Sequence, residues 1–375
     1  MSGSGGGQTP IKDMSFDGSR RRFAATALSA LAYAALAGCD GAAFAPQGPG
    51  RGAASAALLL PLTGANAGVG AAMAQAARLA GLGRPPEALP RIHDTSDTPE
   101  GAAMAAQAAL QAGARLLMGP LRSDQTPAVL AVAGSVPVVT FSNDDRLAGA
   151  GAFVLGVTAA QSVAAMFSFA LAQRLTRIAV VATPGPLGAA TSDAAVRIAA
   201  AGGLNLSATL LRDPAAPGLV QALRSASGGV LPQAVFLPDG GTALAGFAKG
   251  LRGSALQIMG SVQWGIGDAA ANGNLDGSVF AAPPPDLFQP FSDRFLAAYG
   301  SEPGVVAALG HDAVLMALGL GDSGTLNRAG LLRRAGFTGV LGDFSFQADG
   351  RCRRNLSVLG IEAGNIVIRA EVAGT

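Results

Sequence analysis

The stretch from Leu116 to Asp144, LLMGPLRSDQTPAVLAVAGSVPVVTFSND, restricts the fold more than any other part of the chain. It contains an apolar run at 116–118, a polar turn, a segment with helical spacing at 126–133 and a second apolar run at 136–141. A strand, a loop, a helix and a strand in about 30 residues have the size of one βαβ unit. Runs that are apolar on both faces are typical of parallel strands buried between helix layers. The stretch therefore predicts a parallel sheet.

Small polar residues follow both predicted strands of this stretch. Ser123 lies in the turn after the first strand, and the second strand is followed by Ser142, Asn143 and Asp144. In open parallel sheets, ligands bind outside the carboxyl ends of the strands. We therefore expect the two turns to face one crevice and to contact a ligand there. The alternative is a local role, because Ser and Asp commonly cap the helix that follows a strand. The sequence leaves both readings open.

The alternation of strands and helices continues along most of the chain. Its length of 375 residues, 50% of them hydrophobic, allows a large core and two lobes. We predict an α/β fold with two doubly wound parallel-sheet lobes within residues 56–375. The first lobe would consist of about 56–155 plus 283–335, and the second of about 156–282 plus 336–375.

The first 38 residues have the parts of an export signal. A basic cluster within 19–23 precedes an apolar run at 24–36 and the sequence L-A-G-C, which ends at Cys39. This sequence resembles a lipobox, so we expect a signal peptide over 1–38 and a diacylglyceryl group on the Cys39 thiol. The basic cluster also fits a twin-arginine signal, and the choice between the two export routes stays open. The Gly/Pro/Ala-rich linker at 39–55 would then form a flexible tether.

The sequence offers few residues for catalysis or metal binding. His93 and His311 lie in different regions, and His93 and Asp94 would point to opposite faces of a strand. No G-x-S-x-G, H-E-x-x-H or Walker pattern occurs. The formal net charge of +2, without a basic stripe among aromatic residues, argues against nucleic acid as a partner. We therefore predict a binding protein that is not an enzyme and has no metal or cofactor.

Two further expectations concern the membrane and the cysteines. We expect that no apolar run beyond the signal reaches the roughly 18 residues that a membrane helix needs. Cys352 has no partner once Cys39 carries a lipid, so the mature chain would contain no intrachain disulfide.

Several weak motifs occur in an order that resembles a known family. They are P-L-T-G at 61–64, G-P-x-x-S at 119–123, F-S-N-D at 141–144 and H-D-A at 311–313. The chain resembles the periplasmic solute-binding proteins of the Leu/Ile/Val class, and more closely the alphaproteobacterial lipoproteins called penicillin-binding-protein activators. The likeness extends from about Ala56 to about Val367. It implies a periplasmic binding protein type I fold, in which a hinge joins the two lobes. His311 replaces a tyrosine of the family, so we expect its ring to pack as the tyrosine would.

The resemblance also indicates site residues. It places Ser123, Ser142 and Asp144 where amino-acid-binding relatives hold the carboxylate of the ligand. A hydroxyl group suits that role, whereas the charge of Asp144 would repel a carboxylate. The candidate ligand-binding residues are Ser123, Ser142, Asn143, Asp144, Asp239 and Gln263.

The chain departs from the amino-acid-binding relatives in the second lobe. Those relatives use an aromatic residue and an acidic residue there, and Leu187 and Gln263 stand at about these positions. Asp239 or Asp144 could take over the missing acid. Both departures argue against binding of an α-amino acid.

Two functions follow from the resemblance. The first is a lipid-anchored periplasmic receptor of the Leu/Ile/Val type, which binds a small polar ligand, such as an amino acid, for the permease of an ABC importer. The second is a penicillin-binding-protein activator, which acts on a peptidoglycan synthase and needs no ligand. The polar turns favour the first, and the departures in the second lobe favour the second. Either protein would sit on the periplasmic face of the cell envelope, and Asp40 slightly favours the inner membrane.

Overall fold

The computed structural model describes residues 55–374, without the side chains of residues 266–268. The predicted signal peptide, Cys39 and all of the linker before Ser55 lie outside these residues.

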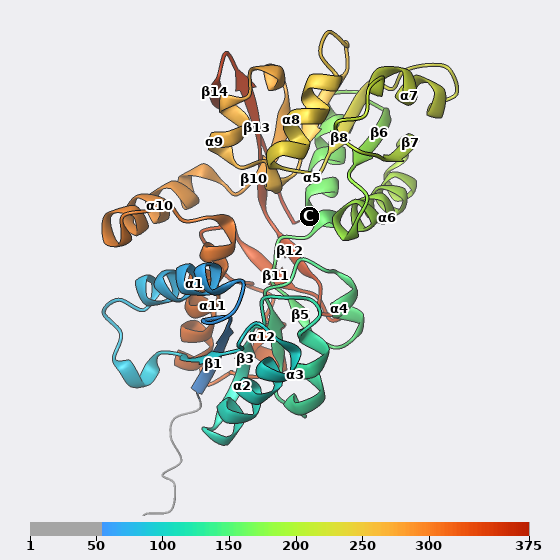
Figure 1. Ribbon diagram of the computed structural model, residues 1–375. Coiled ribbons are helices and arrows are strands. Elements are labelled where there is room, and N and C mark those ends of the chain that lie inside the picture. Colours follow the sequence, from blue (N-terminus) through green and yellow to red (C-terminus); the bar gives the residue numbers. More distant parts are fainter. Residues whose placement is uncertain (1–54, 375) are drawn as a thin grey trace, which may run out of the picture. The chain divides into compact units, whose positions relative to one another are not determined.

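Five parallel strands form the first sheet, in the order β2-β1-β3-β4-β5 (Figure 1). The strands are β1 (Ser55–Leu60), β2 (Arg91–Asp94), β3 (Ala114–Met118), β4 (Val138–Thr140) and β5 (Phe153–Val154). The intervening helices are α1 (Ala67–Ala80), η1 (Pro86–Ala88), α2 (Pro99–Gln111), α3 (Thr126–Ala133) and α4 (Arg146–Gly149). The strand, helix and strand predicted within 116–141 are β3, α3 and β4, so this prediction is confirmed.

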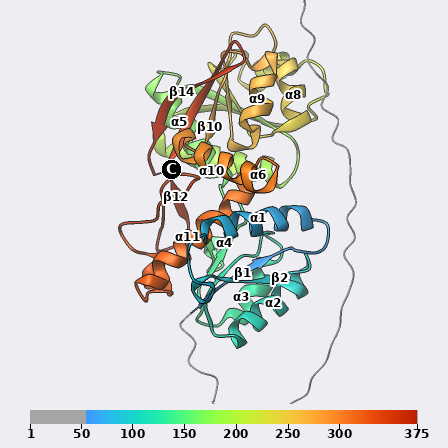
Figure 2. The ribbon, with the colours of Figure 1, turned by 90° about the vertical axis from the view of Figure 1, so that its left-hand side faces the viewer.

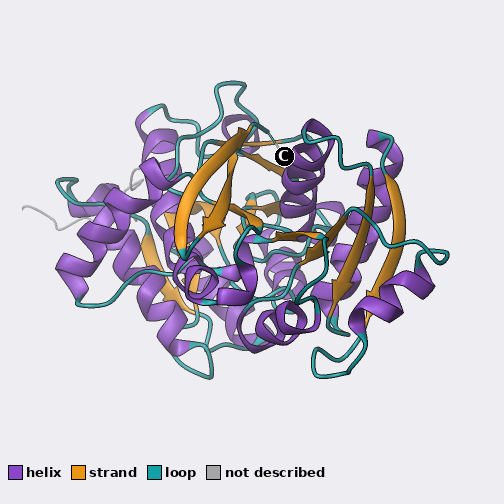
Figure 3. Ribbon diagram, turned by 90° about the horizontal axis from the view of Figure 1, so that it is seen from above, coloured by secondary structure: helices purple, strands orange, loops and turns teal. Residues whose placement is uncertain are grey.

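Strand β1 shows why the first sheet is buried on both faces. Leu58 and Leu60 point to one face and join a core cluster that includes Met73 of α1. Leu59 points to the other face and joins a separate cluster with Ala106 of α2. Because successive side chains of a strand alternate between faces, an uninterrupted apolar run requires helices on both sides of the sheet. Figure 3 shows helices on either side of the strands.

Seven strands form the second sheet, in the order β14-β13-β10-β9-β8-β6-β7. Strands β6 to β10 pair in parallel, whereas β13 and β14 close the sheet in antiparallel orientation. The strands are β6 (Arg177–Ala182), β7 (Asn205–Leu211), β8 (Ala234–Leu237), β9 (Gln257–Gly260), β10 (Val279–Ala282), β13 (Leu356–Glu362) and β14 (Asn365–Val372). The helices are α5 (Ala159–Ala172), α6 (Pro186–Gly202), α7 (Leu219–Ala226), α8 (Gly241–Gly250), η2 (Val262–Trp264), α9 (Ile266–Ala271) and η3 (Gly273–Leu275). Two largely parallel α/β sheets confirm the predicted fold class.

The segment after β10 supplies three more helices and a small hairpin. These elements are α10 (Pro285–Tyr299), α11 (Val305–Asp322), α12 (Arg328–Leu331) and the antiparallel pair β11 (Phe344–Phe346) and β12 (Cys352–Arg354). Helix α11 lies against α1 of the first sheet, as Figure 2 shows.

The hairpin β11–β12 adjoins the first sheet. The Val154 N–H of β5 donates a hydrogen bond to the Gly350 carbonyl (2.9 Å), and Phe346 packs edge-on against Phe153 with ring centroids 5.2 Å apart. The lobe boundaries predicted from the sequence place residues from 336 onward in the second lobe. The lobe boundaries stay a prediction. Any lobe boundary in this region has to allow for the contact of the hairpin with the first sheet.

Helix α11 corrects one expectation. Its 18 residues are long and apolar enough to cross a membrane by length and composition, although no run of that kind was expected. The apolar character is spread around the helix and interrupted by His311 and Asp312, so it does not stand out as a continuous run. Because 67% of the helix is buried inside the protein, its apolar character is explained by its place in the core.

His311 and Cys352 are both buried in this region. The His311 ring packs against Phe291 of α10, with centroids 4.9 Å apart, as expected for a residue that replaces an aromatic. Cys352 is a free cysteine, and burial raises the pKa of its thiol. Among the described residues, no group of three or more His, Cys, Asp or Glu side chains could hold a metal ion.

Candidate functional site

Three of the predicted site residues line one hollow of about 200 Å³. Ser142 and Asn143 reach it from the loop after β4, and Gln263 reaches it from η2, directly after β9. The start of α11 and the segment before α5 complete the wall. The remaining lining residues are Leu121, Phe141, Val157, Val262, Val305 and Val306. The hollow therefore lies at the carboxyl ends of parallel strands from both sheets, where open α/β sheets bind ligands.

A much smaller hollow, of about 10 Å³, adjoins the first. Both are lined by Asn143, Val157, Val262 and Gln263. The other residues around the small hollow are Thr158, Ala159, Ser162, Leu187, Thr191, Phe236, Pro238 and Ser261. It thus extends from the larger hollow toward the starts of α5 and α6.

Threonine hydroxyl groups fix the loop that carries Ser142. The Oγ1 atoms of Thr126 and Thr140 lie 3.0 Å apart, and the Thr140 hydroxyl also donates to the Pro120 carbonyl (3.1 Å). The Ser142 N–H in turn donates to Thr140 Oγ1 (3.2 Å). These bonds tie the loop after β3 to the loop after β4. The position of Ser142 is thereby set by buried groups and does not depend on a ligand.

Asp144 and Ser123 do not line the hollow. The Asp144 carboxylate accepts hydrogen bonds from the Arg146 N–H (3.0 Å) and from its guanidinium (2.9 and 2.7 Å). These bonds from Arg146 lower the pKa of Asp144, although partial burial opposes them. Ser123 is exposed, and its carbonyl accepts the Thr126 N–H at the start of α3. Both residues are engaged in local turn structure, and the neighbouring Leu121 takes the place on the hollow.

Asp239 plays a structural part in the second sheet. Its carboxylate accepts hydrogen bonds from the N–H (3.0 Å) and the hydroxyl group of Thr183. Thr183 follows β6 and Asp239 follows β8, so the bond joins two loops at the carboxyl edge of the sheet. Asp239 is 6% exposed and lines neither hollow described above.

The polar turn after β1 is held in the same way. The Asp94 carboxylate accepts the N–H groups of Leu62 (2.9 Å) and Thr63 (3.2 Å) and the Thr63 hydroxyl (2.7 Å). Burial opposes the charge of Asp94, but hydrogen bonds from Thr63, Ser96 and Leu62 outweigh it and lower its pKa. The turn is therefore held in place by the carboxylate at the end of β2.

Asp145 behaves differently from its neighbour Asp144. Burial raises the pKa of the Asp145 carboxyl, and a hydrogen bond with Thr158 and the charges of Arg351 and Arg197 offset this only in part. A raised pKa in the folded state contributes stability below the ordinary pKa of about 3.9 that is lost as the pH rises through the folded value.

We therefore expect Asp145→Asn to be more stable than the wild type at pH 7, by less than about 1 kcal/mol because the group is only partly buried. Urea unfolding at pH 7 and at pH 3.5 measures this, and the advantage should vanish at the lower pH. Asp144→Asn is the matched control and should lose stability at pH 7, since its pKa is lowered. An advantage of Asp145→Asn that persists at pH 3.5 would contradict the assignment.

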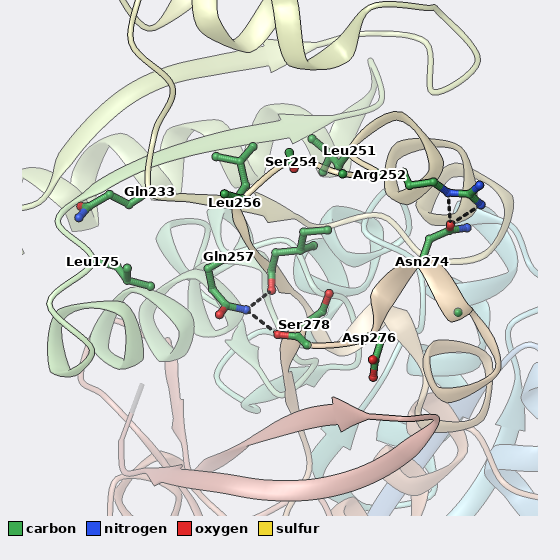
Figure 4. A pocket seen from close by; sticks show the side chains of 15 residues that line it. Leu175, Gln233, Leu251, Arg252, Ser254, Leu256, Gln257, Asn274, Asp276 and Ser278 are labelled. Carbon is green, nitrogen blue, oxygen red and sulfur yellow. Dashed lines mark hydrogen bonds between the residues drawn. The ribbon is translucent and has the colours of Figure 1, made fainter.

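A larger hollow, of about 1040 Å³, lies at the other edge of the second sheet (Figure 4). Gln233 and Gln257 mark the amino ends of β8 and β9 there. Its polar side chains bond to groups of the same region: Gln257 Nε2 donates to the Gly277 carbonyl (3.0 Å), and Arg252 donates to Asn274 Oδ1 (2.9 and 2.7 Å). Ligands of parallel sheets bind at the carboxyl ends, so we place the site at the smaller hollows.

Most of the apolar residues that line the larger hollow could not be identified from the sequence. The same holds for the hydroxyl groups that reach the small hollow from the second sheet. Val305 and Val306 begin α11 and are more than 40 residues from Gln263 in the chain, so no local pattern connects them. Thr191 lies inside a helix, where a polar residue is ordinarily read as surface. A signal that the sequence does contain is the position of a residue directly after a predicted strand. This signal identifies Ser261 and Val262.

Comparisons with known proteins agree with this architecture. A protein-family profile described as "Periplasmic binding protein" matches residues 55–365. A search of curated proteins found no significant match.

Several solved structures are similar. A protein from Rhodospirillum rubrum, provisionally named a branched-chain amino acid ABC transporter, is 21% identical, with a TM-score of 0.74 over 84% of this chain and 100% of that one. A solute-binding protein of an ABC transporter from R. palustris, in complex with benzoate, is 20% identical, with a TM-score of 0.62 over 86% and 97%. The C-domain of LpoA from Haemophilus influenzae, a regulator of PBP1A, is 19% identical, with a TM-score of 0.66 over 84% and 100%.

At these identities the structures establish a shared fold. The family profile goes further, because it covers most of the chain, including both sheets and the loops that line the hollows. The chain belongs to the periplasmic binding protein family.

Proposed function

We propose that this protein is the solute receptor of an ABC importer and binds a small molecule in the hollow of about 200 Å³. The observation that carries the proposal is the meeting of Ser142, Asn143 and Gln263 in one hollow, from loops at the carboxyl ends of two different sheets. A receptor of this class works by closing two lobes on its ligand, and polar groups from both sides are what such closure needs. The R. palustris and R. rubrum structures, whose names refer to ABC transporters, support this choice.

The ligand that fits best is a small organic acid with an apolar body. The described lining contains no ionisable side chain, and six of its nine residues are apolar. Hydroxyl and amide groups of Ser142 and Asn143 can hold a carboxylate, but an ammonium group would have no carboxylate partner in this lining. Asp144 and Asp239, the candidates for that partner, are engaged with Arg146 and Thr183. An acid such as benzoate therefore fits better than a branched-chain amino acid.

A lipid anchor at Cys39 and a periplasmic location are part of the same proposal. They rest on the L-A-G-C sequence after an apolar run and on the family's periplasmic setting. The mass of the processed N-terminus would reveal the diacylglyceryl group.

The test is a thermal-shift and calorimetry screen of the whole protein against amino acids and small aliphatic and aromatic acids. A ligand should raise the melting temperature, because it stabilises the folded protein by RT ln(1 + [L]/Kd). Asn143→Ala and Gln263→Ala should each weaken binding about tenfold, because each removes one hydrogen-bonding group from the hollow.

Asn205→Ala is the matched control, since Asn205 is exposed at the start of β7 and far along the chain from either loop. It should leave binding unchanged. A screen in which no compound stabilises the protein would count against a receptor.

The second candidate function is that of a penicillin-binding-protein activator. The fold match to the LpoA C-domain covers all of that domain, and the hollow lacks the acidic group that would hold an amino acid. Such a protein would stimulate a peptidoglycan synthase without a ligand. Stimulation of synthase activity by the purified protein, combined with an empty ligand screen, would favour this function over transport.

A further inference from the structure

We propose that the small hollow beside the main one is a specificity subsite, in which Thr191 receives a single hydroxyl group of the ligand. The inference rests on the proposed receptor function and deepens it, because it specifies a chemical feature of the ligand. The bound acid would carry a hydroxyl group on the end that reaches α6.

Thr191 is the group in this region with unused hydrogen-bonding capacity. It lies in α6, is 0% exposed, and its Oγ1 atom has no hydrogen-bond partner in the structure. A buried hydroxyl without a partner loses its hydrogen bonds to water and gains nothing in return. Because Thr191 also lines the small hollow, the space beside it is where a partner can be supplied.

The other hydroxyl groups around the hollow are already engaged. Ser261 Oγ donates to the Pro238 carbonyl (2.6 Å) and accepts the Gln263 N–H (3.0 Å). Thr158 Oγ1 accepts the Gln161 N–H (3.3 Å) as the cap of α5, and Ser162 Oγ accepts the Val262 N–H (3.5 Å). The contrast singles out Thr191 among the hydroxyl groups that surround this space.

The size and charge of the hollow define the group that fits. A volume of about 10 Å³ is at the lower limit for one water molecule, so it admits one oxygen atom and little else. All of its described lining side chains are neutral. A charged group placed there would lose its hydration without gaining an ionic partner, whereas a neutral hydroxyl can both donate to and accept from Thr191.

The larger hollow adjoins this subsite. Asn143, Val157, Val262 and Gln263 border both spaces. A ligand held at Ser142 can therefore extend one substituent past Gln263 to Thr191. An ordered water in the small hollow is the competing occupant, and it predicts no preference for hydroxylated ligands.

Matched pairs of acids that differ only by hydroxyl or methyl test the proposal. Suitable probes are 4-hydroxybenzoate with 4-methylbenzoate, and 3-hydroxybutyrate with 3-methylbutyrate. In the wild-type protein, the hydroxylated member of at least one pair should bind about tenfold more tightly by calorimetry. Thr191→Val keeps the shape and removes the hydroxyl, so the preference should fall to less than about threefold. Thr191→Ser should retain it.

Ser192→Ala is the control within the same helix, because the Ser192 hydroxyl donates to the Gly188 carbonyl (2.9 Å) and does not line the hollow. It should keep the wild-type preference. Thr191→Ala provides a second variant if the valine protein does not fold. Equal binding of both members by the wild type, or a preference that survives Thr191→Val, overturns the subsite while leaving the receptor intact. If no acid of any pair binds while another compound of the screen does, the subsite fails and the receptor stands; if no compound of the screen binds, both proposals fail.

Discussion

Replacing Arg354 with methionine is expected to destabilise the protein by about 3–5 kcal/mol, because it leaves a buried carboxylate without its cation. Arg354 and Asp312 are both 0% exposed, and Arg354 Nη1 lies 3.6 Å from Asp312 Oδ2. The guanidinium also donates to the Leu155 carbonyl (3.1 Å) and lies 4.8 Å from the centre of the Phe344 ring. Methionine keeps much of the volume but none of these charged contacts.

Asp312 also accepts hydrogen bonds from the backbone, which makes it a poor site for the same experiment. Its carboxylate accepts the N–H groups of Val340 (2.7 Å) and Leu341 (3.3 Å). Even asparagine at this position keeps only one of the two acceptor oxygens and removes the charge. The double variant Arg354→Met/Asp312→Asn should nevertheless recover part of the loss, because it removes the unpaired charge.

Chemical denaturation measures the effect, and Arg351→Met is the matched control. Arg351 lies three residues away and pairs with Asp349 at 3.1 Å, but both side chains are about half exposed. Exposed pairs contribute about 0–1 kcal/mol, so the control should lose little. If Arg354→Met lost no more than Arg351→Met, the buried pair would not stabilise this fold.

Gly260→Ala is expected to destabilise the protein by about 1–3 kcal/mol or more, through steric conflict in the core. A Cβ atom at Gly260 would lie 2.1 Å from Trp264 Cε2 and 2.3 Å from Cδ2. Trp264 cannot move away without cost, because it is fully buried, stacks on Phe280 at 5.5 Å and donates from Nε1 to the Leu237 carbonyl (2.9 Å). A whole indole ring would have to shift to accept one methyl group.

Gly273→Ala is the control for this substitution. Gly273 lies in η3 of the same sheet region, and a Cβ atom there meets nothing within 4 Å. Its free energy of unfolding should remain within about 0.5 kcal/mol of that of the wild type. A Gly260→Ala protein with wild-type stability and wild-type tryptophan fluorescence would show that the indole can be accommodated elsewhere.

The positions of β1, β3 and β6 along the chain could be predicted, because each of these buried strands contains an uninterrupted apolar run. Each run is short and is followed at once by a polar turn, so the hydrophobic pattern and the length of the run both indicate a strand. The position of β11–β12 beside β5 could not be predicted. It depends on the contact of Phe346 with Phe153, which are nearly 200 residues apart, and no local pattern encodes that pairing.

The residues of the site could likewise be predicted only where their position in the local sequence indicates it. Ser142, Asn143 and Gln263 were identified because they follow strands that end at one edge of their sheets. Asp144 follows the same strand, but Arg146 two residues later provides a closer partner for its carboxylate. The neighbouring side chains thus decide whether a polar residue lines the hollow or bonds within its own turn. The position of the residue after a strand does not distinguish these two cases.

Burial of Cys352 has a practical consequence for studying lobe motion. With its side chain enclosed in β12 and its thiol held protonated by a raised pKa, it should react slowly with maleimides and similar labels. Fluorophores can therefore be attached to cysteines introduced at exposed positions of each sheet while the native residue stays in place. The distance between such dyes would report directly on whether the two halves approach each other when a compound is added.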